Sequence, residues 1–181
     1  YVYSKGQALM LPGDTAWCET TLGILRSHLD LGDTAAAFAS LRDITIDGTK
    51  PWSNIGRLYV ARWVWKNFGD SEQALSLYAD AIRYGADSPV ADSAALGMGQ
   101  LYFSSQMFAE ARTAVESRWQ TLEKTDTIAV EFAKLITEAM WEQGFQDSAM
   151  EFAVVNAESI SMPCKFLIFS GKLALSQGRP E

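Results

Sequence analysis

The chain has 181 residues, of which 48% are hydrophobic and 20% are charged, and its formal net charge is −7. This composition is typical of a folded soluble protein and excludes a disordered one. The acidic balance argues against non-specific binding of nucleic acid, which depends on clustered lysine and arginine.

Cysteine and histidine are scarce, which limits the chemistry of the chain. There are two cysteines, Cys18 and Cys164, and a single histidine, His28. A zinc site of these residue types is therefore not expected, and neither is a disulfide framework, so a cytoplasmic location is favoured. Because no apolar run reaches 18 residues, we expect no membrane insertion. Since the chain begins at Tyr1, a removed signal peptide stays open as an alternative.

Residues 1–14 differ from the rest of the chain. They end in the stop signal Pro12-Gly13. We interpret this segment as an N-terminal cap, or as the last helix of a preceding hairpin.

From residue 15 onward, apolar helix-like runs come in pairs joined by short turns. The turns align on residues 34 to 38 positions apart, namely Gly32, Gly69, Gln106, Gly144 and Gly178. Spacing of this size predicts stacked helical hairpins, in which glycine ends the first helix in the left-handed conformation. Proline-containing segments such as "DGTKPWSN" and "ESISMP" separate the pairs.

The second run of each pair has helix signals. Asp33 and Asp70 stand where an N-cap is expected. In "SEQALSLYADAI", one helix face carries the apolar residues Ala74, Leu77, Tyr78, Ala81 and Ile82. The segment "DITID" could instead form a short strand.

The stretch "RLYVARWVWKNFGD", residues 57–70, interleaves basic and aromatic residues. Such a pattern can form a stacking surface for bases. Within the repeat it is instead the first helix of a pair, and we expect Tyr59, Trp63 and Trp65 to pack between neighbouring hairpins.

This pattern resembles tetratricopeptide repeats. Gly99 and Tyr102 match the small and aromatic positions of the first helix, and Ala74 and Tyr78 match the second. The period is mostly longer than 34 residues and the leading tryptophan is absent, so a Sel1-like or another helical-hairpin repeat remains an alternative. The resemblance covers residues 15–178. It implies an all-α, right-handed superhelical solenoid of four to five hairpins, with repeats at 15–50, 51–89, 90–126, 127–163 and a partial repeat at 164–181.

The resemblance also implies a function. Proteins of this kind use a groove lined by their first helices for protein–protein interaction, so we expect a non-catalytic scaffold or adaptor that binds a peptide or a partner helix. The alternative is a ligand- or peptide-sensing regulatory domain of a larger protein. A homodimer through the terminal repeats is a further expectation. The groove positions correspond here to Arg26, Asp30, Arg62, Lys66, Gln100, Phe103, Ser104, Lys134, Glu138, Trp141 and Lys172.

Other chemistry has weaker support. Asp43, Thr45, Asp47 and Gly48 have the spacing of a calcium loop, but Asn54 stands where a bidentate glutamate is required, so a plain loop is the default. "GMGQLY" lacks the last glycine of a dinucleotide fingerprint, and close helix packing accounts better for Gly97 and Gly99. We therefore expect no catalytic residues, metal, cofactor or nucleic-acid partner.

Overall fold

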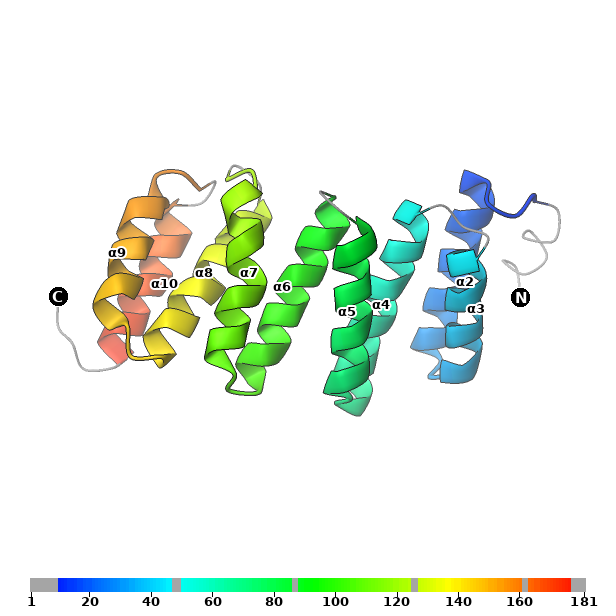
Figure 1. Cartoon of the computed structure of the whole chain (residues 1–181), viewed down its shortest axis with the longest axis horizontal. Helices are drawn as coiled ribbons and strands as arrows, with labels where there is room; N and C mark the ends of the chain where they lie inside the picture. Colours follow the sequence, from blue (N-terminus) through cyan, green and yellow to red (C-terminus); the bar gives the residue numbers. More distant parts are fainter. Residues whose placement is uncertain (1–9, 47–49, 86–87, 125–126, 161–162, 177–181) are drawn as a thin grey trace. The chain divides into compact units, whose positions relative to one another are not determined.

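The computed structural model describes residues 10–46, 50–85, 88–124, 127–160 and 163–176. All regular secondary structure within these residues is α-helical, which confirms the all-α prediction (Figure 1). The helices are α2 (Thr15–Asp30), α3 (Thr34–Ile46), α4 (Lys50–Phe68), α5 (Ser71–Gly85), α6 (Pro89–Ser104), α7 (Phe108–Thr121), α8 (Thr127–Glu142), α9 (Gln146–Ala157) and α10 (Pro163–Ser176). The short-strand alternative is wrong, since Asp43–Ile46 belongs to α3; Asp47 lies outside the described residues.

Tight turns join the helices into the pairs α2–α3, α4–α5, α6–α7 and α8–α9. We call α2, α4, α6, α8 and α10 the first helices, and the others the second helices. The segment before α2 ends in a turn, with the Asp14 amide donating to the Leu11 carbonyl at 3.2 Å. Residues 1–9 of the predicted cap or helix over residues 1–14 lie outside the described part of the chain.

The turns have the left-handed conformation that the sequence predicts. The backbone angle φ is +74° at Gly32, +65° at Gly69, +60° at Gln106 and +86° at Gly144. After three of these left-handed residues, the amide of the next residue donates to a carbonyl in the last turn of the preceding helix. An example is the bond from the Met107 amide to the Tyr102 carbonyl at 2.9 Å. Gly178 is not among the described residues.

Side-chain caps start two of the second helices, as predicted. The Asp33 carboxylate accepts a hydrogen bond from the Ala36 amide at 3.1 Å, and Asp70 accepts one from the Gln73 amide at 3.0 Å. Each bond satisfies an amide that the first turn of a helix leaves without a partner. The apolar face predicted for α5 is also found, with Ala74, Tyr78 and Ala81 fully buried.

The helices form two compact units, residues 1–94 and 95–181. In unit 1, α2 packs on α3 and α4, α3 contacts α4, and α4 packs on α5. In unit 2, α7 packs on α8, α8 on α9, and α10 on both α8 and α9. The division falls within α6. Each unit has its own apolar core, with Leu25, Ile44 and Val64 buried in unit 1 and Val115, Phe132 and Ile136 buried in unit 2.

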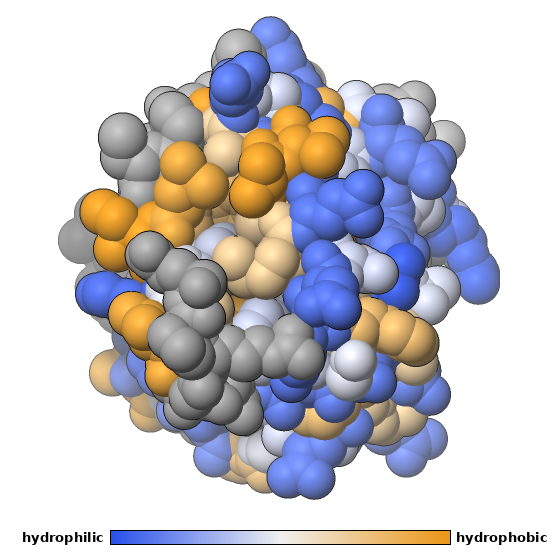
Figure 2. All heavy atoms as spheres, turned by 90° about the vertical axis from the view of Figure 1, so that its left-hand side faces the viewer, coloured by the Kyte–Doolittle hydropathy of each residue, from blue (hydrophilic) through white to orange (hydrophobic). Residues whose placement is uncertain are grey.

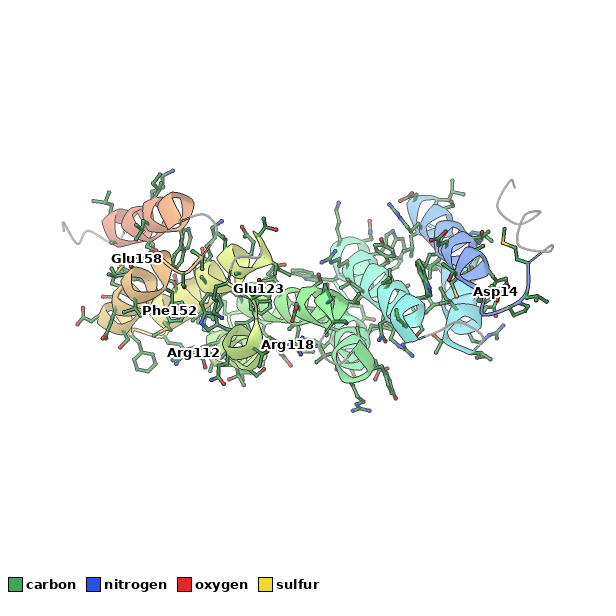
Figure 3. The ribbon with its side chains drawn as sticks, turned by 90° about the horizontal axis from the view of Figure 1, so that it is seen from above. Asp14, Arg112, Arg118, Glu123, Phe152 and Glu158 are labelled. Carbon is green, nitrogen blue, oxygen red and sulfur yellow. The ribbon has the colours of Figure 1, made fainter. Side chains whose placement is uncertain are left out.

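Unit 2 contains two close contacts that tie neighbouring pairs together. A Cβ atom added at Gly99 of α6 would lie 2.8 Å from both Val115 Cγ1 and Leu135 Cδ2, so the absence of a side chain allows this approach. This confirms close packing as the reason for Gly99. One turn further along α7, the Trp119 ring packs on Phe152 of α9 with ring centroids 5.7 Å apart (Figure 3, where Phe152 is labelled).

Candidate functional site

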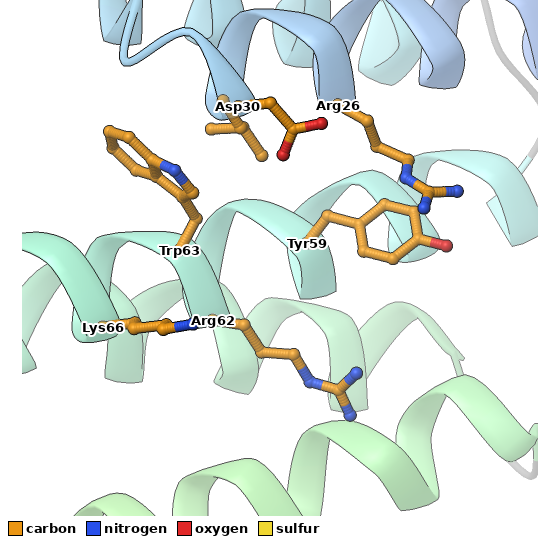
Figure 4. A pocket seen from close by; sticks show the side chains of 7 residues that line it. Arg26, Asp30, Tyr59, Arg62, Trp63 and Lys66 are labelled. Atoms are coloured by element: carbon orange, nitrogen blue, oxygen red, sulfur yellow. The ribbon is translucent and has the colours of Figure 1, made fainter.

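A hollow of about 250 Å³ lies between the two first helices of unit 1 (Figure 4). We call it the basic hollow. It takes three lining residues from α2 and four from α4, at helical spacings that bring them onto facing sides. They are Arg26, Leu29, Asp30, Tyr59, Arg62, Trp63 and Lys66. The structure thus brings together the four residues of α2 and α4 that the sequence analysis selected.

Aromatic contacts hold the walls of the basic hollow in place. The Arg26 guanidinium lies over the Tyr59 ring, 5.1 Å from its centroid, which is a cation–π distance. The Trp63 ring meets Phe68 edge to face, with centroids 4.9 Å apart. Leu29, only 5% exposed, contributes an apolar surface. The hollow therefore combines two ordered aromatic rings with charged groups.

Positive charge dominates the basic hollow. Three of its lining side chains are cations and one, Asp30, is a carboxylate. Within the described chain, no ion pair joins Arg26, Arg62 or Lys66 to a carboxylate. Arg62 instead leaves α4 on the side away from α2 (Figure 4) and lies near the hydroxyl of Tyr78. Burial raises the pKa of Tyr78, and the Arg62 guanidinium partly opposes that shift.

A second hollow, of about 350 Å³, lies on the first helices of unit 2. We call it the acidic hollow. Its lining comes from α6, α8 and α10, and consists of Gln100, Phe103, Ser104, Glu131, Lys134, Leu135, Glu138 and Phe169. Five of these eight residues belong to the predicted groove. Lys172, another predicted residue, lines an adjoining hollow with Lys134, Ile168 and Phe169.

The charges of the acidic hollow are arranged along α8. Lys134 Nζ lies 2.9 Å from Glu131 Oε1 and 5.8 Å from the centroid of the Phe169 ring. Burial raises the pKa of Glu138; Lys134 opposes the shift, and the neighbouring carboxylates of Glu131 and Glu142 add to it. A positive charge brought close to Glu138 would therefore stabilise its ionised form.

Trp141 is the exception among the predicted groove residues. It is only 3% exposed, and it lines none of the three hollows described above. Its side chain belongs to the apolar core of unit 2, where it can contribute to packing but cannot reach a partner. The expectation that Trp141 faces the groove is corrected accordingly.

The sequence analysis missed some wall residues that are aromatic. Tyr59 and Trp63 were expected to be packing residues, yet both remain partly exposed and line the basic hollow. Phe169 does the same in the acidic hollow. A usable signal exists in the chain: Tyr59 and Trp63 each lie three residues from a predicted polar groove residue, which places them on adjoining parts of the same helix face.

The described residues contain no group of three or more His, Cys, Asp and Glu side chains that could hold a metal ion. Asp43 and Thr45 belong to a helix, and the Thr45 hydroxyl donates to the Leu41 carbonyl at 2.7 Å. The first residues with calcium-loop spacing therefore do not lie in a loop. Asp47 and Gly48 lie outside the described residues. His28 Nδ1 is 3.9 Å from the Asp33 carboxylate, at the end of α2.

No helix in the described part of the chain is long and apolar enough to cross a membrane. On the face formed by α9 and α10, apolar side chains gather beside a hydrophilic area (Figure 2). The exposed apolar residues of these two helices include Val154 and Val155 of α9 and Ile168 and Leu175 of α10. The homodimer through the terminal repeats stays a prediction.

A search of protein-family models found no match to this chain, and a search of curated proteins found none either.

Proposed function

We propose that this chain is a non-catalytic interaction domain, a scaffold or adaptor, that binds a peptide or a partner helix on its first helices. One observation carries the proposal. Most of the residues that the resemblance to tetratricopeptide repeats selected as groove positions line hollows on the first helices in both units. Surfaces lined by first helices are what protein-binding helical repeats use.

The lining of the hollows favours a protein partner over a small substrate. Each hollow combines aromatic rings with charged groups, and such combinations anchor the side chains of a bound segment. The basic hollow, at about 250 Å³, is smaller than the 300–1,000 Å³ usual for ligand pockets. It therefore suits one large side chain of a longer partner.

The non-catalytic proposal has support from the one serine of the described linings. Ser104 is the only hydroxyl-bearing aliphatic residue among the described linings, and its hydroxyl donates to the Leu101 carbonyl at 2.8 Å rather than to a base. Nucleophilic catalysis would require a base within hydrogen-bond reach of that hydroxyl. The charged residues suit recognition of a partner better than bond cleavage.

We also propose that the helix pairs continue as a right-handed superhelical solenoid of the tetratricopeptide type. The support is the recurring pattern of contacts. In unit 1, α2 contacts α3, α3 contacts α4, and the first helices α2 and α4 contact each other. In unit 2, α8, α9 and α10 make the same three contacts. This is the pattern of stacked hairpins.

Charge reversal on the first helices tests the proposed function. The double variant Arg62→Glu with Lys66→Glu changes two exposed residues of the basic hollow, and we expect it to lose partners that the unchanged chain captures from cells. Arg42→Glu with Arg83→Glu is the matched control, because it makes the same change of charge on exposed positions of second helices.

Captured proteins are identified by mass spectrometry, and the fold of each variant is checked by circular dichroism. If both double variants keep the same partners with the fold intact, the basic hollow is not the binding surface. Loss of the same partners from both variants would also count against it, because total charge rather than the hollow would then determine binding.

A further inference from the structure

We infer that the basic hollow selects an acidic segment of the partner, with carboxylate side chains on either side of an aromatic or large aliphatic residue. This inference rests on the proposed function and names the class of segment that unit 1 binds. It follows from the unpaired cations, the aromatic walls and the size of the hollow.

The first argument is charge. The chain has a net charge of −7, yet the basic hollow is lined by the cations Arg26 and Lys66 against the single carboxylate of Asp30. Arg62 also belongs to the lining, but its guanidinium extends from α4 away from α2 (Figure 4). None of these cations has an ion-pair partner within the described residues. An incoming carboxylate would therefore form charge-assisted hydrogen bonds without breaking an existing ion pair.

The second argument is the order already present in the walls. The contact with Tyr59 holds the Arg26 guanidinium, and the contact with Phe68 holds the Trp63 ring. Groups that are fixed before binding lose little conformational freedom when a ligand arrives. The space between the two rings, with the apolar side chain of Leu29 beside it, suits an apolar side chain better than a further charge (Figure 4).

The third argument concerns nucleic acid, which also pairs anionic groups with rings. A single strand brings one phosphate per nucleotide and extends well beyond a hollow of about 250 Å³. Beyond the hollow it would meet a chain whose net charge is negative, and repulsion would oppose binding. A short acidic peptide segment places its charge only where the cations are. The structure therefore favours the peptide.

The test uses fluorescence anisotropy with labelled peptides that are acetylated and amidated at their ends. One peptide has aspartate and glutamate on both sides of a phenylalanine; the second has asparagine and glutamine at the same positions. We expect the acidic peptide to bind the full chain at least about tenfold more tightly, and its affinity to fall as salt rises. A labelled thymidine oligonucleotide is the third probe.

Variants with opposite expected effects make the test specific. Arg26→Gln and Lys66→Gln each remove a cation, and we expect each to weaken the acidic peptide about tenfold. Asp30→Asn removes the one carboxylate of the hollow and should strengthen binding by about threefold. Arg42→Gln is the control: its side chain is 72% exposed, it lies near Asp43 on α3, and it should change nothing. All four positions are exposed, so the fold should be retained.

Several outcomes would overturn the inference. If the amide peptide binds as tightly as the acidic one, charge does not select the segment, although the proposed interaction function would stand. The inference also fails, and the proposed interaction function also stands, if the acidic peptide does not bind at millimolar concentration while partner capture still depends on Arg62 and Lys66. Tighter binding of the oligonucleotide at the same salt would show that the hollow recognises nucleic acid instead.

Discussion

At the scale of single residues, Gln106 is unusual among the turns. Its backbone angle φ is +60°, in the left-handed region. In the other described turns that join the two helices of a pair, glycine occupies this position. A side chain in this conformation costs about 1–2 kcal/mol through the contact between Cβ and the following carbonyl. We predict that Gln106→Gly raises the free energy of unfolding by about 0.5–1 kcal/mol, measured by urea denaturation.

Gly69→Ala is the matched control for this prediction. Its φ is +65°, and a Cβ atom there would meet nothing within 4 Å. Any loss of stability would therefore come from the backbone conformation alone, and we expect about 1 kcal/mol. If Gln106→Gly were destabilising while Gly69→Ala had no effect, left-handed strain would not govern these turns.

Glu138 gives a prediction about pH. Burial and the nearby carboxylates raise its pKa in the folded chain. The folded state then binds this proton more tightly than the unfolded chain does, so the contribution of Glu138 to stability falls as pH rises from about 4 through the raised folded pKa. We expect Glu138→Gln to be more stable than the unchanged chain at pH 7, and to lose that advantage near pH 4.

Urea denaturation at the two pH values measures this difference, and NMR titration of the Glu138 carboxyl measures the pKa itself. Glu151→Gln is the control, because Glu151 of α9 is exposed, does not line the acidic hollow and is not among the groups that shift the pKa of Glu138. A Glu138→Gln variant that is less stable than the unchanged chain at pH 7 would mean that the carboxylate is stabilised by its surroundings.

At the scale of helices, two glycines provide a matched pair. Gly99 of α6 is in close contact with α7 and α8, whereas Gly171 of α10 has open space around it. We expect Gly99→Ala to lower the free energy of unfolding by about 1–3 kcal/mol, because Leu135 and Val115 must move. Gly171→Ala should raise it by about 0.5–1 kcal/mol, because alanine is the better helix former.

Thermal and urea denaturation of the two variants test the pair directly. Equal stabilisation by both substitutions would show that α6 does not approach its neighbours as closely as the distances indicate. A loss of stability for Gly171→Ala would show instead that another surface covers that side of α10.

Local signals in the sequence predicted much of what the helices show. The turns and the caps depend on neighbouring residues only, so Gly32, Gly144, Asp33 and Asp70 could be assigned from the chain alone. The resemblance to a known repeat then indicated which helices carry the groove. That interpretation selected most of the polar residues and Phe103, but it missed the other aromatic rings of the hollows, those of Tyr59, Trp63 and Phe169.

The limits of prediction are clear on α8. Lys134 and Trp141 are seven residues apart, which is about two helical turns, so helix geometry places them on the same face. In the structure Lys134 lines the acidic hollow and Trp141 is buried. Periodicity cannot separate the two residues, because what covers each of them is decided by packing against other helices. The spacing within one helix can indicate which residues face a hollow, but the hollow itself also requires the neighbouring helix that faces them.

At the scale of the whole molecule, the contacts within each unit are local in chain order. Among the described helices of a unit, those that pack together are at most two positions apart. In stacked repeats, stability is approximately a sum of repeat terms and nearest-neighbour terms, so separate parts can open separately. A globular fold with many distant contacts would lose its protection as one unit.

Hydrogen exchange measured by mass spectrometry distinguishes these cases. Phe132 of α8 and Val64 of α4 are fully buried in different units. We predict that Phe132→Leu speeds amide exchange in α7 to α10 and leaves α2 to α4 unchanged, whereas Val64→Ala does the reverse. Each substitution removes buried apolar contacts and should cost about 1–3 kcal/mol. If both variants instead speed amide exchange equally along the whole chain, the helices unfold together. The parts of the proposed solenoid would then not open separately, as nearest-neighbour packing predicts.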